Sequence, residues 1–172
     1  MTTNLETLRI LLSEFDGRAM TILGEISARL RTQEGYLDDL IHLAGDSDEG
    51  VSSGSTWLIK SWLEEEGKLT DEQTSALVSR LQEVREWSAV LHVCQSIRYL
   101  RVVGEDAAKL IAWLSPLLSH KRPFIRAWSL DAICHVSKSE TRFADEAQHA
   151  LRLAKDDPAG SVQARVRNIQ LC

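Results

Sequence analysis

The side chains in this sequence best suited to binding chemistry are arginines spread through its second half. Four of them, Arg98, Arg101, Arg126 and Arg165, fall on or beside apolar segments with helical spacing. A guanidinium presents its N–H groups in a flat fork, so it binds carboxylates and phosphates through two parallel hydrogen bonds. We therefore predict that these arginines contact an acidic partner. The alternative interpretation is ordinary solvated surface charge.

An aromatic ring and a carboxylate stand close to one of these arginines. Trp128 and Asp131 are three residues apart, which places two side chains on the same face of a helix, and Arg126 precedes them. This trio would suit an aromatic-lined groove. The alternative is that Trp128 packs in the core, as we expect of the other tryptophans, because large apolar rings are mostly buried.

The cysteines and histidines form no catalytic or metal-binding pattern. His92 and Cys94 are two residues apart and Cys134 and His135 are adjacent, and such neighbours on a helix do not face each other. Zinc ligands come in closely spaced pairs, which this sequence lacks. With Cys172, the cysteines number three and are widely spaced, which predicts free thiols in a reducing compartment. We expect no catalytic residue, no metal and no cofactor.

Charge is unevenly distributed along the chain. Its 172 residues carry a net charge of −5, but residues 1–72 carry −9 and residues 73–172 carry +4. A charge of +4 is small for a nucleic-acid-binding domain, whose pI is commonly above about 9. No apolar run approaches the roughly 18 residues needed to cross a bilayer, and the first residues lack a secretory signal pattern. We expect a cytoplasmic protein without a membrane partner.

Two apolar series repeat with a period of about 37 residues. The first is Leu40, Leu77, Leu114 and Leu151, and the second is Val51, Trp87, Ile125 and Val162. Around their members, apolar residues recur at the i, i+3, i+4 and i+7 spacing that forms one stripe on a helix. Two series in step, the second following the first by about 11 residues, predict a two-helix unit repeated four times.

Signals for helix ends agree with this unit. Thr70 and Gln73 have the spacing of a capping box. Pro123 suits the first turn of a helix, and Asp157, followed by proline, predicts another helix start. Pro116 falls inside an apolar-periodic segment and should kink that helix.

Residues 1–34 precede the repeats. Their apolar positions predict one interrupted helix or a helical pair, with the break near Gly17. We interpret this segment as a cap on the open end of a helical stack, because terminal repeats need such covers. The alternative is a dimerisation helix.

The turns inside the repeated units resemble those of HEAT repeats, in which two apolar residues, a short acidic turn and a valine-arginine pair follow one another. Residues 43–51, 117–127 and 153–164 have this order. Asp46 and Asp156 match the family's turn aspartate, and only Arg126 matches its arginine. The resemblance implies an all-α fold, a right-handed α–α superhelix of about four HEAT-like helical pairs. These pairs fall at about residues 35–67, 70–102, 104–138 and 141–171, behind the N-terminal cap of residues 1–34, in one structural domain.

The resemblance also implies a function. HEAT-like arrays are interaction scaffolds whose second helices line a groove, so we predict a non-enzymatic adaptor that binds an acidic protein or peptide through the four arginines. The alternative is a nucleic-acid-binding protein, because Trp128, Asp131 and Arg126 resemble the aromatic, carboxylate and arginine of HEAT-like alkylpurine DNA glycosylases. A third interpretation is self-association of the acidic half of one copy with the basic half of another.

Overall fold

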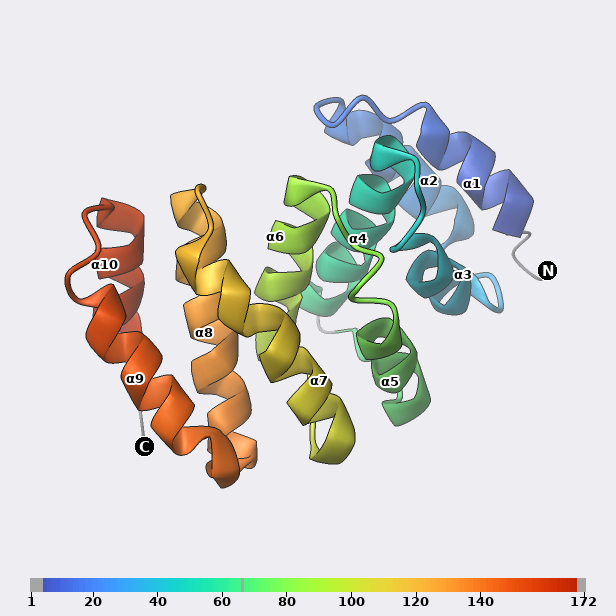
Figure 1. Ribbon diagram of the computed structural model, residues 1–172. Helices are drawn as coiled ribbons and strands as arrows, with labels where there is room; N and C mark the ends of the chain where they lie inside the picture. The colour runs from blue at the N-terminus through green and yellow to red at the C-terminus, as the bar shows by residue number, and fades with distance from the viewer. Residues whose placement is uncertain (1–4, 66, 170–172) are drawn as a thin grey trace. The chain divides into compact units, whose positions relative to one another are not determined.

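The structure is a computed structural model that describes residues 5–65 and 67–169 (Figure 1). Within these ranges it contains ten α-helices and three short 3-10 helices, and no β-strand. The predicted all-α class is confirmed. None of the helices in these ranges combines the length and the apolar character needed to cross a membrane. Contacts group the chain into two compact units, residues 1–93 and 94–172. The single domain and its repeat boundaries stay predictions.

The first unit is built around a buried helix, α4. Its helices are α1 (Leu5–Ser13), α2 (Met20–Leu30), α3 (Tyr36–Leu43), α4 (Glu49–Glu64) and α5 (Asp71–Ser79), followed by the beginning of α6 (Trp87–Ser96). α1, α2 and α3 pack against α4, and α5 packs against α3. Residues 5–30 therefore form a pair of helices rather than one interrupted helix, and Gly17 lies in the break with a φ of 78°.

Two glycines let α1 approach α4 closely. A Cβ at Gly50 would lie 2.5 Å from the carbonyl oxygen of Phe15, and a Cβ at Gly54 would lie 2.9 Å from the Leu12 side chain. Carbon atoms do not pack this closely, so any larger residue would push the two helices apart.

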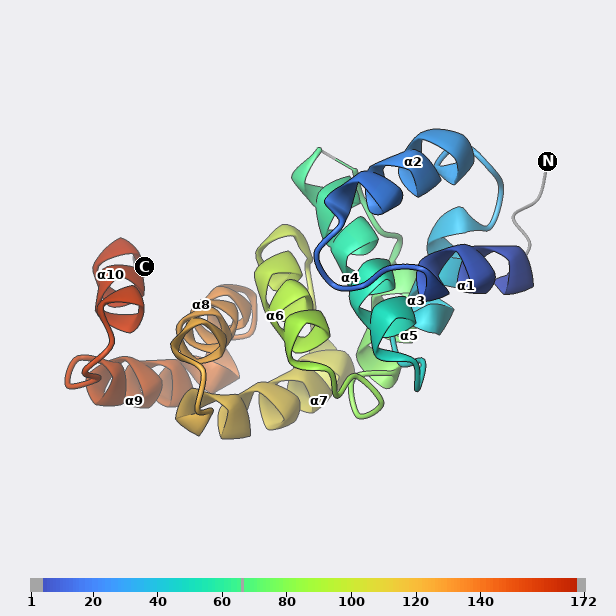
Figure 2. The same cartoon turned by 90° about the horizontal axis from the view of Figure 1, so that it is seen from above.

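The second unit is built around another central helix, α8. Its elements after the end of α6 are η1 (Ile97–Tyr99), α7 (Gly104–Leu114), η2 (Ser115–Ser119), α8 (Pro123–Ser139), η3 (Thr141–Phe143), α9 (Ala144–Ala154) and α10 (Gly160–Asn168). α8 packs against each of the others in this series. Within this unit, α7 and α9 form one layer and α8 and α10 form the other (Figure 2).

Two of the predicted helix ends are confirmed. Gln73 N donates to Thr70 Oγ1 and Thr70 N donates to Gln73 Oε1, each at 3.1 Å, so the capping box at the start of α5 is complete. Pro123 is the first residue of α8, where its missing N–H leaves no intrahelical acceptor without a donor.

The other two helix ends differ from prediction. Pro116 does not kink a continuing helix, because α7 ends at Leu114 and the chain tightens into η2. The prediction at Asp157 was wrong, since α10 begins at Gly160. The Asp157 carboxylate instead accepts a hydrogen bond from Ala159 N at 2.9 Å and closes the turn before the helix.

The second apolar series is correct except at Trp87. Val51, Ile125 and Val162 are each the third residue of their helix, and all three are buried. Trp87 is instead the first residue of α6 and is 44% exposed, and the third residue, Ala89, takes the core position. The spacing alone selected a large apolar residue two positions too early.

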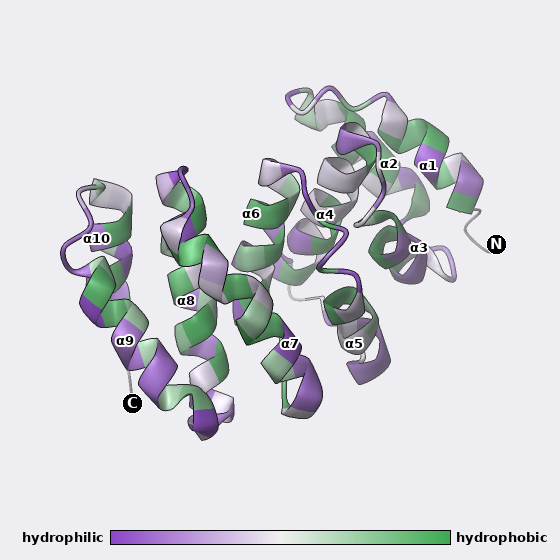
Figure 3. Ribbon diagram, viewed as in Figure 1, coloured by the Kyte–Doolittle hydropathy of each residue, from purple (hydrophilic) through white to green (hydrophobic). Residues whose placement is uncertain are grey.

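The tryptophans are less buried than expected. Trp113 is buried, but Trp57, Trp62 and Trp128 are only half-buried, so core packing explains them in part. Along the helices of the second unit, hydrophilic residues recur on α9, whereas the middle of α8 is mainly hydrophobic or neutral (Figure 3).

Side-chain hydrogen bonds recur between residues about one repeat apart. In the first unit they join Asp38 to Gln73, Ser53 to Ser88 and Thr56 to His92, and in the second they join Leu100 to His135 and Asp131 to Arg165. The separations are 34 to 36 residues, close to the period of the apolar series. Within their units, these bonds join α3 to α5, α4 to α6, the end of η1 to α8, and α8 to α10.

Candidate anion-binding surface

The short segment that follows α6 presents two of the predicted arginines. Ile97 and Leu100 are buried and anchor η1 and its C-terminal end, whereas Arg98, Tyr99 and Arg101 are exposed. His135 Nε2, on α8, lies 3.0 Å from the carbonyl oxygen of Leu100. A carbonyl can only accept, so this ring nitrogen carries the proton and donates it. The arrangement fixes the segment on α8 and directs its arginines outward.

Two of the predicted arginines lie over one aromatic ring. The Cζ atoms of Arg98 and Arg165 are 5.3 Å and 3.8 Å from the centroid of the Trp128 ring. Trp128 is the sixth residue of α8 and Arg165 is the sixth residue of α10, so the two occupy corresponding positions on two helices that pack against each other. A guanidinium over an indole face is attracted by the ring quadrupole, and this holds both side chains in place.

One carboxylate belongs to this cluster. Asp131, only 9% exposed, accepts a hydrogen bond from Arg165 Nη1 at 3.3 Å. It therefore balances the charge of Arg165. Arg98, Arg101 and the exposed Lys138 have neither an ion pair nor a hydrogen bond with any residue in the described ranges. The three cations leave an excess of positive charge around the ring.

Two cavities open among these cations. A smaller one of about 190 Å³ is lined by Arg98, Asp131, Cys134, His135, Lys138, Asn168 and Ile169. A larger one of about 340 Å³ is lined by Arg98, Tyr99, Leu100, Arg101, His135, Lys138 and Ser139. Both share Arg98 and Lys138, so they adjoin. We call the six residues Arg98, Tyr99, Arg101, Trp128, Lys138 and Arg165 the basic surface.

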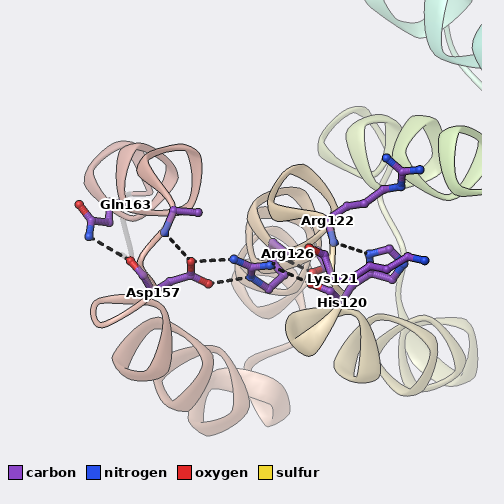
Figure 4. A network of polar contacts seen from close by, with 8 residues as sticks. His120, Lys121, Arg122, Arg126, Asp157 and Gln163 are labelled. Atoms are coloured by element: carbon purple, nitrogen blue, oxygen red, sulfur yellow. Dashed lines mark hydrogen bonds and ion pairs between the residues drawn. The ribbon is translucent and has the colours of Figure 1, made fainter.

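The fourth predicted arginine, Arg126, lies apart from the basic surface in a structural network (Figure 4). Its Nε and Nη2 donate to Asp157 Oδ2 and Oδ1 at 2.7 Å and 2.8 Å, and its Nη1 donates to the carbonyl oxygen of His120 at 2.9 Å. The two charged side chains are only 16% and 13% exposed. Arg126 thus joins the turn before α8 to the turn before α10.

This pair involves the aspartate next to the one selected from the sequence. The sequence match assigned the turn aspartate to Asp156, but the carboxylate that binds Arg126 belongs to Asp157. The hydrogen bond from Arg126 holds the pKa of Asp157 below its usual range, so the carboxylate stays ionised near neutral pH. A similar pair, Arg9 with Asp46 at 2.7 Å, bridges α1 and the turn before α4 in the first unit.

The cysteine thiols of the second unit are poor nucleophiles. Cys94 and Cys134 are free, as predicted, and both are buried; Cys172 lies outside the described residues. Burial, reinforced by the negative charge of Asp131, raises the pKa of Cys134 to about 12. A thiol with such a pKa stays protonated near neutral pH, and only the thiolate is a good nucleophile. Within the described ranges, no three His, Cys, Asp or Glu side chains gather as metal ligands.

The first unit uses its polar side chains differently. Ser53 Oγ lies 2.6 Å from Ser88 Oγ, and Thr56 Oγ1 lies 3.2 Å from Nδ1 of His92, so these bonds join α4 to α6 within the unit. Glu86 accepts hydrogen bonds from the backbone N–H groups of Ser88 and Ala89 and so caps α6. Burial lowers the pKa of His92 to about 4, which keeps its ring neutral.

Sequence reasoning identified part of the basic surface. It selected Arg98, Arg101 and Arg165; the structure brings Arg98 and Arg165 together over Trp128, and Arg101 lines the larger cavity with Arg98. It missed Lys138, whose place one helical turn beyond Cys134 and two turns beyond Asp131 on α8 could have indicated a shared face. Comparisons of the chain with protein-family models, with curated proteins and with solved structures found no match. The functional interpretation therefore rests on the geometry of this surface.

Proposed function

We propose that this chain is a non-enzymatic protein-interaction scaffold whose basic surface binds an acidic segment of another protein. The observation that carries the proposal is the pair of arginines over Trp128, of which Arg98 has no carboxylate partner in the described ranges. A guanidinium held flat on a ring keeps its N–H edge available for a carboxylate and loses little side-chain entropy on binding. The bound partner would supply the missing negative charge.

We further propose that the helical pairs form a HEAT-like α–α superhelix. Two features support this architecture. Hydrogen bonds link residues 34 to 36 positions apart in both units, as stacked repeats of this period require. The Arg126–Asp157 pair also joins successive inter-helix turns, in the manner of the aspartate–arginine ladder to which the sequence motif points. In such a stack, α8 and α10 are second helices, and they carry Trp128, Lys138 and Arg165.

The charge balance favours a protein partner over nucleic acid. Residues 94–172 carry 12 basic and eight acidic side chains, a net charge of +4. Nucleic-acid-binding domains generally neutralise many phosphates and are far more basic. A few unpaired cations around an aromatic anchor are instead typical of a protein-binding hot spot.

The proposal is tested with a fluorescein-labelled ten-residue peptide rich in glutamate. Its affinity is measured by fluorescence anisotropy for the wild type and for the double variant Arg98→Glu/Arg101→Glu. We expect the double variant to bind more than tenfold more weakly, because two attractive contacts become repulsive. A matched control, Arg152→Glu/Lys155→Glu, reverses two exposed cations at the end of α9 and should bind within twofold of the wild type. Equal affinity of all three proteins would contradict the proposal.

A second candidate function is nucleic-acid binding of the DNA-glycosylase type. The observation that favours it is the meeting of Trp128, Asp131 and Arg165, since an aromatic, a buried carboxylate and an arginine share one site. Arg165 takes the place that the sequence interpretation gave to Arg126. This function predicts that oligonucleotide affinity falls by roughly 40-fold between 50 and 200 mM salt if three phosphates are contacted. A flat salt dependence would exclude it.

A further inference from the structure

We infer that the group anchoring the partner is a phosphate carried by a side chain, such as phosphoserine, bound in the smaller cavity of the basic surface. This inference rests on the proposed function and names the class of its partner. It comes from the size of that cavity, the charge around it and the donors that line it.

The size of the smaller cavity suits one compact group. Its volume is about 190 Å³, below the roughly 300–1,000 Å³ typical of pockets for whole small molecules. The larger cavity beside it, about 340 Å³, shares Arg98 and Lys138 with it and leaves room for the residues that flank the anchoring group. An extended segment would therefore place one side chain in the smaller cavity and its neighbour along Tyr99 and Arg101.

The charge around the smaller cavity matches a dianion. Arg98 and Lys138 line it without an ion-pair partner in the described ranges. Asp131 also lines it and is paired with Arg165. Counting these four groups gives three positive charges and one negative charge. A phosphate monoester carries about −1.5 to −2 charges at neutral pH, whereas a glutamate carries one. A carboxylate would leave one positive charge uncompensated.

The two arginines are also crowded together. Both Cζ distances are measured to the same ring centroid, so the two carbons lie within roughly 9 Å of each other. This separation is below the Debye length of about 10 Å at 0.1 M salt, so the two cations repel. Asp131 compensates only Arg165, because its hydrogen bond goes to that side chain. An anion between Arg98 and Lys138 would relieve the remaining repulsion.

The donors of the cavity fit three acceptor oxygens. The Arg98 guanidinium, the Lys138 ammonium and the Asn168 side-chain amide come from η1, α8 and α10. A phosphate offers three terminal oxygens, each of which accepts charge-assisted hydrogen bonds. A carboxylate has two such oxygens and about half the charge, so it would bind these donors less strongly.

The test uses three labelled peptides with the same glutamate-flanked sequence and a central serine, glutamate or phosphoserine. We expect the wild-type protein to bind the phosphoserine peptide at least tenfold more tightly than the glutamate peptide by fluorescence anisotropy. Two variants that each change the charge by one unit locate the effect. Asn168→Asp adds a negative charge inside the smaller cavity and should remove the preference. Arg101→Gln removes a positive charge outside this cavity. It should weaken the binding of the phosphoserine and glutamate peptides alike and leave the ratio of their affinities unchanged.

The outcomes separate this inference from the proposed function. Equal affinity for the phosphoserine and glutamate peptides would overturn the phosphate anchor and leave the acidic-partner proposal standing. Failure of all three peptides to bind at millimolar concentration would overturn both. A ten-nucleotide single strand that displaces the phosphoserine peptide, with affinity that falls steeply with salt, would show that the phosphate belongs to nucleic acid. Circular dichroism of each variant verifies that it is folded.

Discussion

The two units differ in what their polar side chains contact. In the first unit, the side chains of Ser53 and Thr56 on α4 form hydrogen bonds with side chains on α6, including His92. In the second, Arg98 and Lys138 lie on a surface with no ionic partner in the described ranges. The net charges differ in the same way, −9 for residues 1–93 and +4 for residues 94–172. Internally satisfied polar groups contribute to stability, whereas unsatisfied cations are available for a partner.

The contrast with the cations of the basic surface is sharpest for Arg126, which donates hydrogen bonds through all three of its guanidinium nitrogens. Arg126→Met should lower the free energy of unfolding by about 3 kcal/mol, since it removes the cation that pairs with the poorly exposed Asp157 and the side-chain donor to the carbonyl of His120. Urea denaturation followed by circular dichroism measures this. The control is Lys109→Met, which breaks an exposed pair with Asp106 and should cost less than about 0.5 kcal/mol. Equal costs would show that Arg126 is not structural.

The stability of the first unit should depend on pH through His92. The pKa of His92 is about 4 when folded and about 6.5 when unfolded, so between these values the unfolded chain binds more protons. Stability therefore falls as pH drops from 6.5 to 4. We expect the wild type to lose about 2 kcal/mol more than His92→Gln between pH 7.5 and pH 4.5, by urea denaturation at each pH. Parallel pH profiles would contradict the neutral state of this ring.

The smallest effect on stability is expected at the basic surface. Arg101 is exposed and unpaired within the described ranges, so Arg101→Gln should change the free energy of unfolding by less than about 0.5 kcal/mol. The same variant should bind the glutamate-rich peptide a few-fold more weakly than the wild type. A loss of stability comparable with that of Arg126→Met would erase the distinction between the two kinds of arginine.

The helical class and most helix positions followed from the period of 37 residues. Leu40, Leu77 and Leu114 are buried as the first series requires, because one face of each helix has to leave water, whereas the fourth member, Leu151, is only half-buried. The error at Trp87 has a simple physical origin. A small residue, Ala89, fills the core position of α6, and apolar spacing is weighted toward large side chains. Counting from the first residue of the helix identifies the core position better than side-chain size does, because Ala89 is the third residue of α6.

The basic surface was only partly predictable for a different reason. Trp128 and Arg165 are 37 residues apart, so the repeat itself indicates that they are neighbours. Arg126 and Arg165 are both arginines on second helices, and composition does not distinguish them. Their roles depend on which carboxylate lies opposite, Asp157 in a partly buried bidentate pair or Asp131 beside a cavity. Such pairings depend on side-chain direction, which spacing leaves open.

The most direct test of the binding surface uses the indole N–H signals of the five tryptophans in a ¹⁵N-labelled sample, recorded by nuclear magnetic resonance while the glutamate-rich peptide is added. Trp128 lies under both arginines, whereas Trp57, Trp62 and Trp87 belong to the first unit. We predict that the Trp128 signal shifts most and that no indole signal shifts in Arg98→Glu/Arg101→Glu. An unmoved Trp128 signal at saturating peptide, or a larger shift at a first-unit tryptophan, would contradict the account.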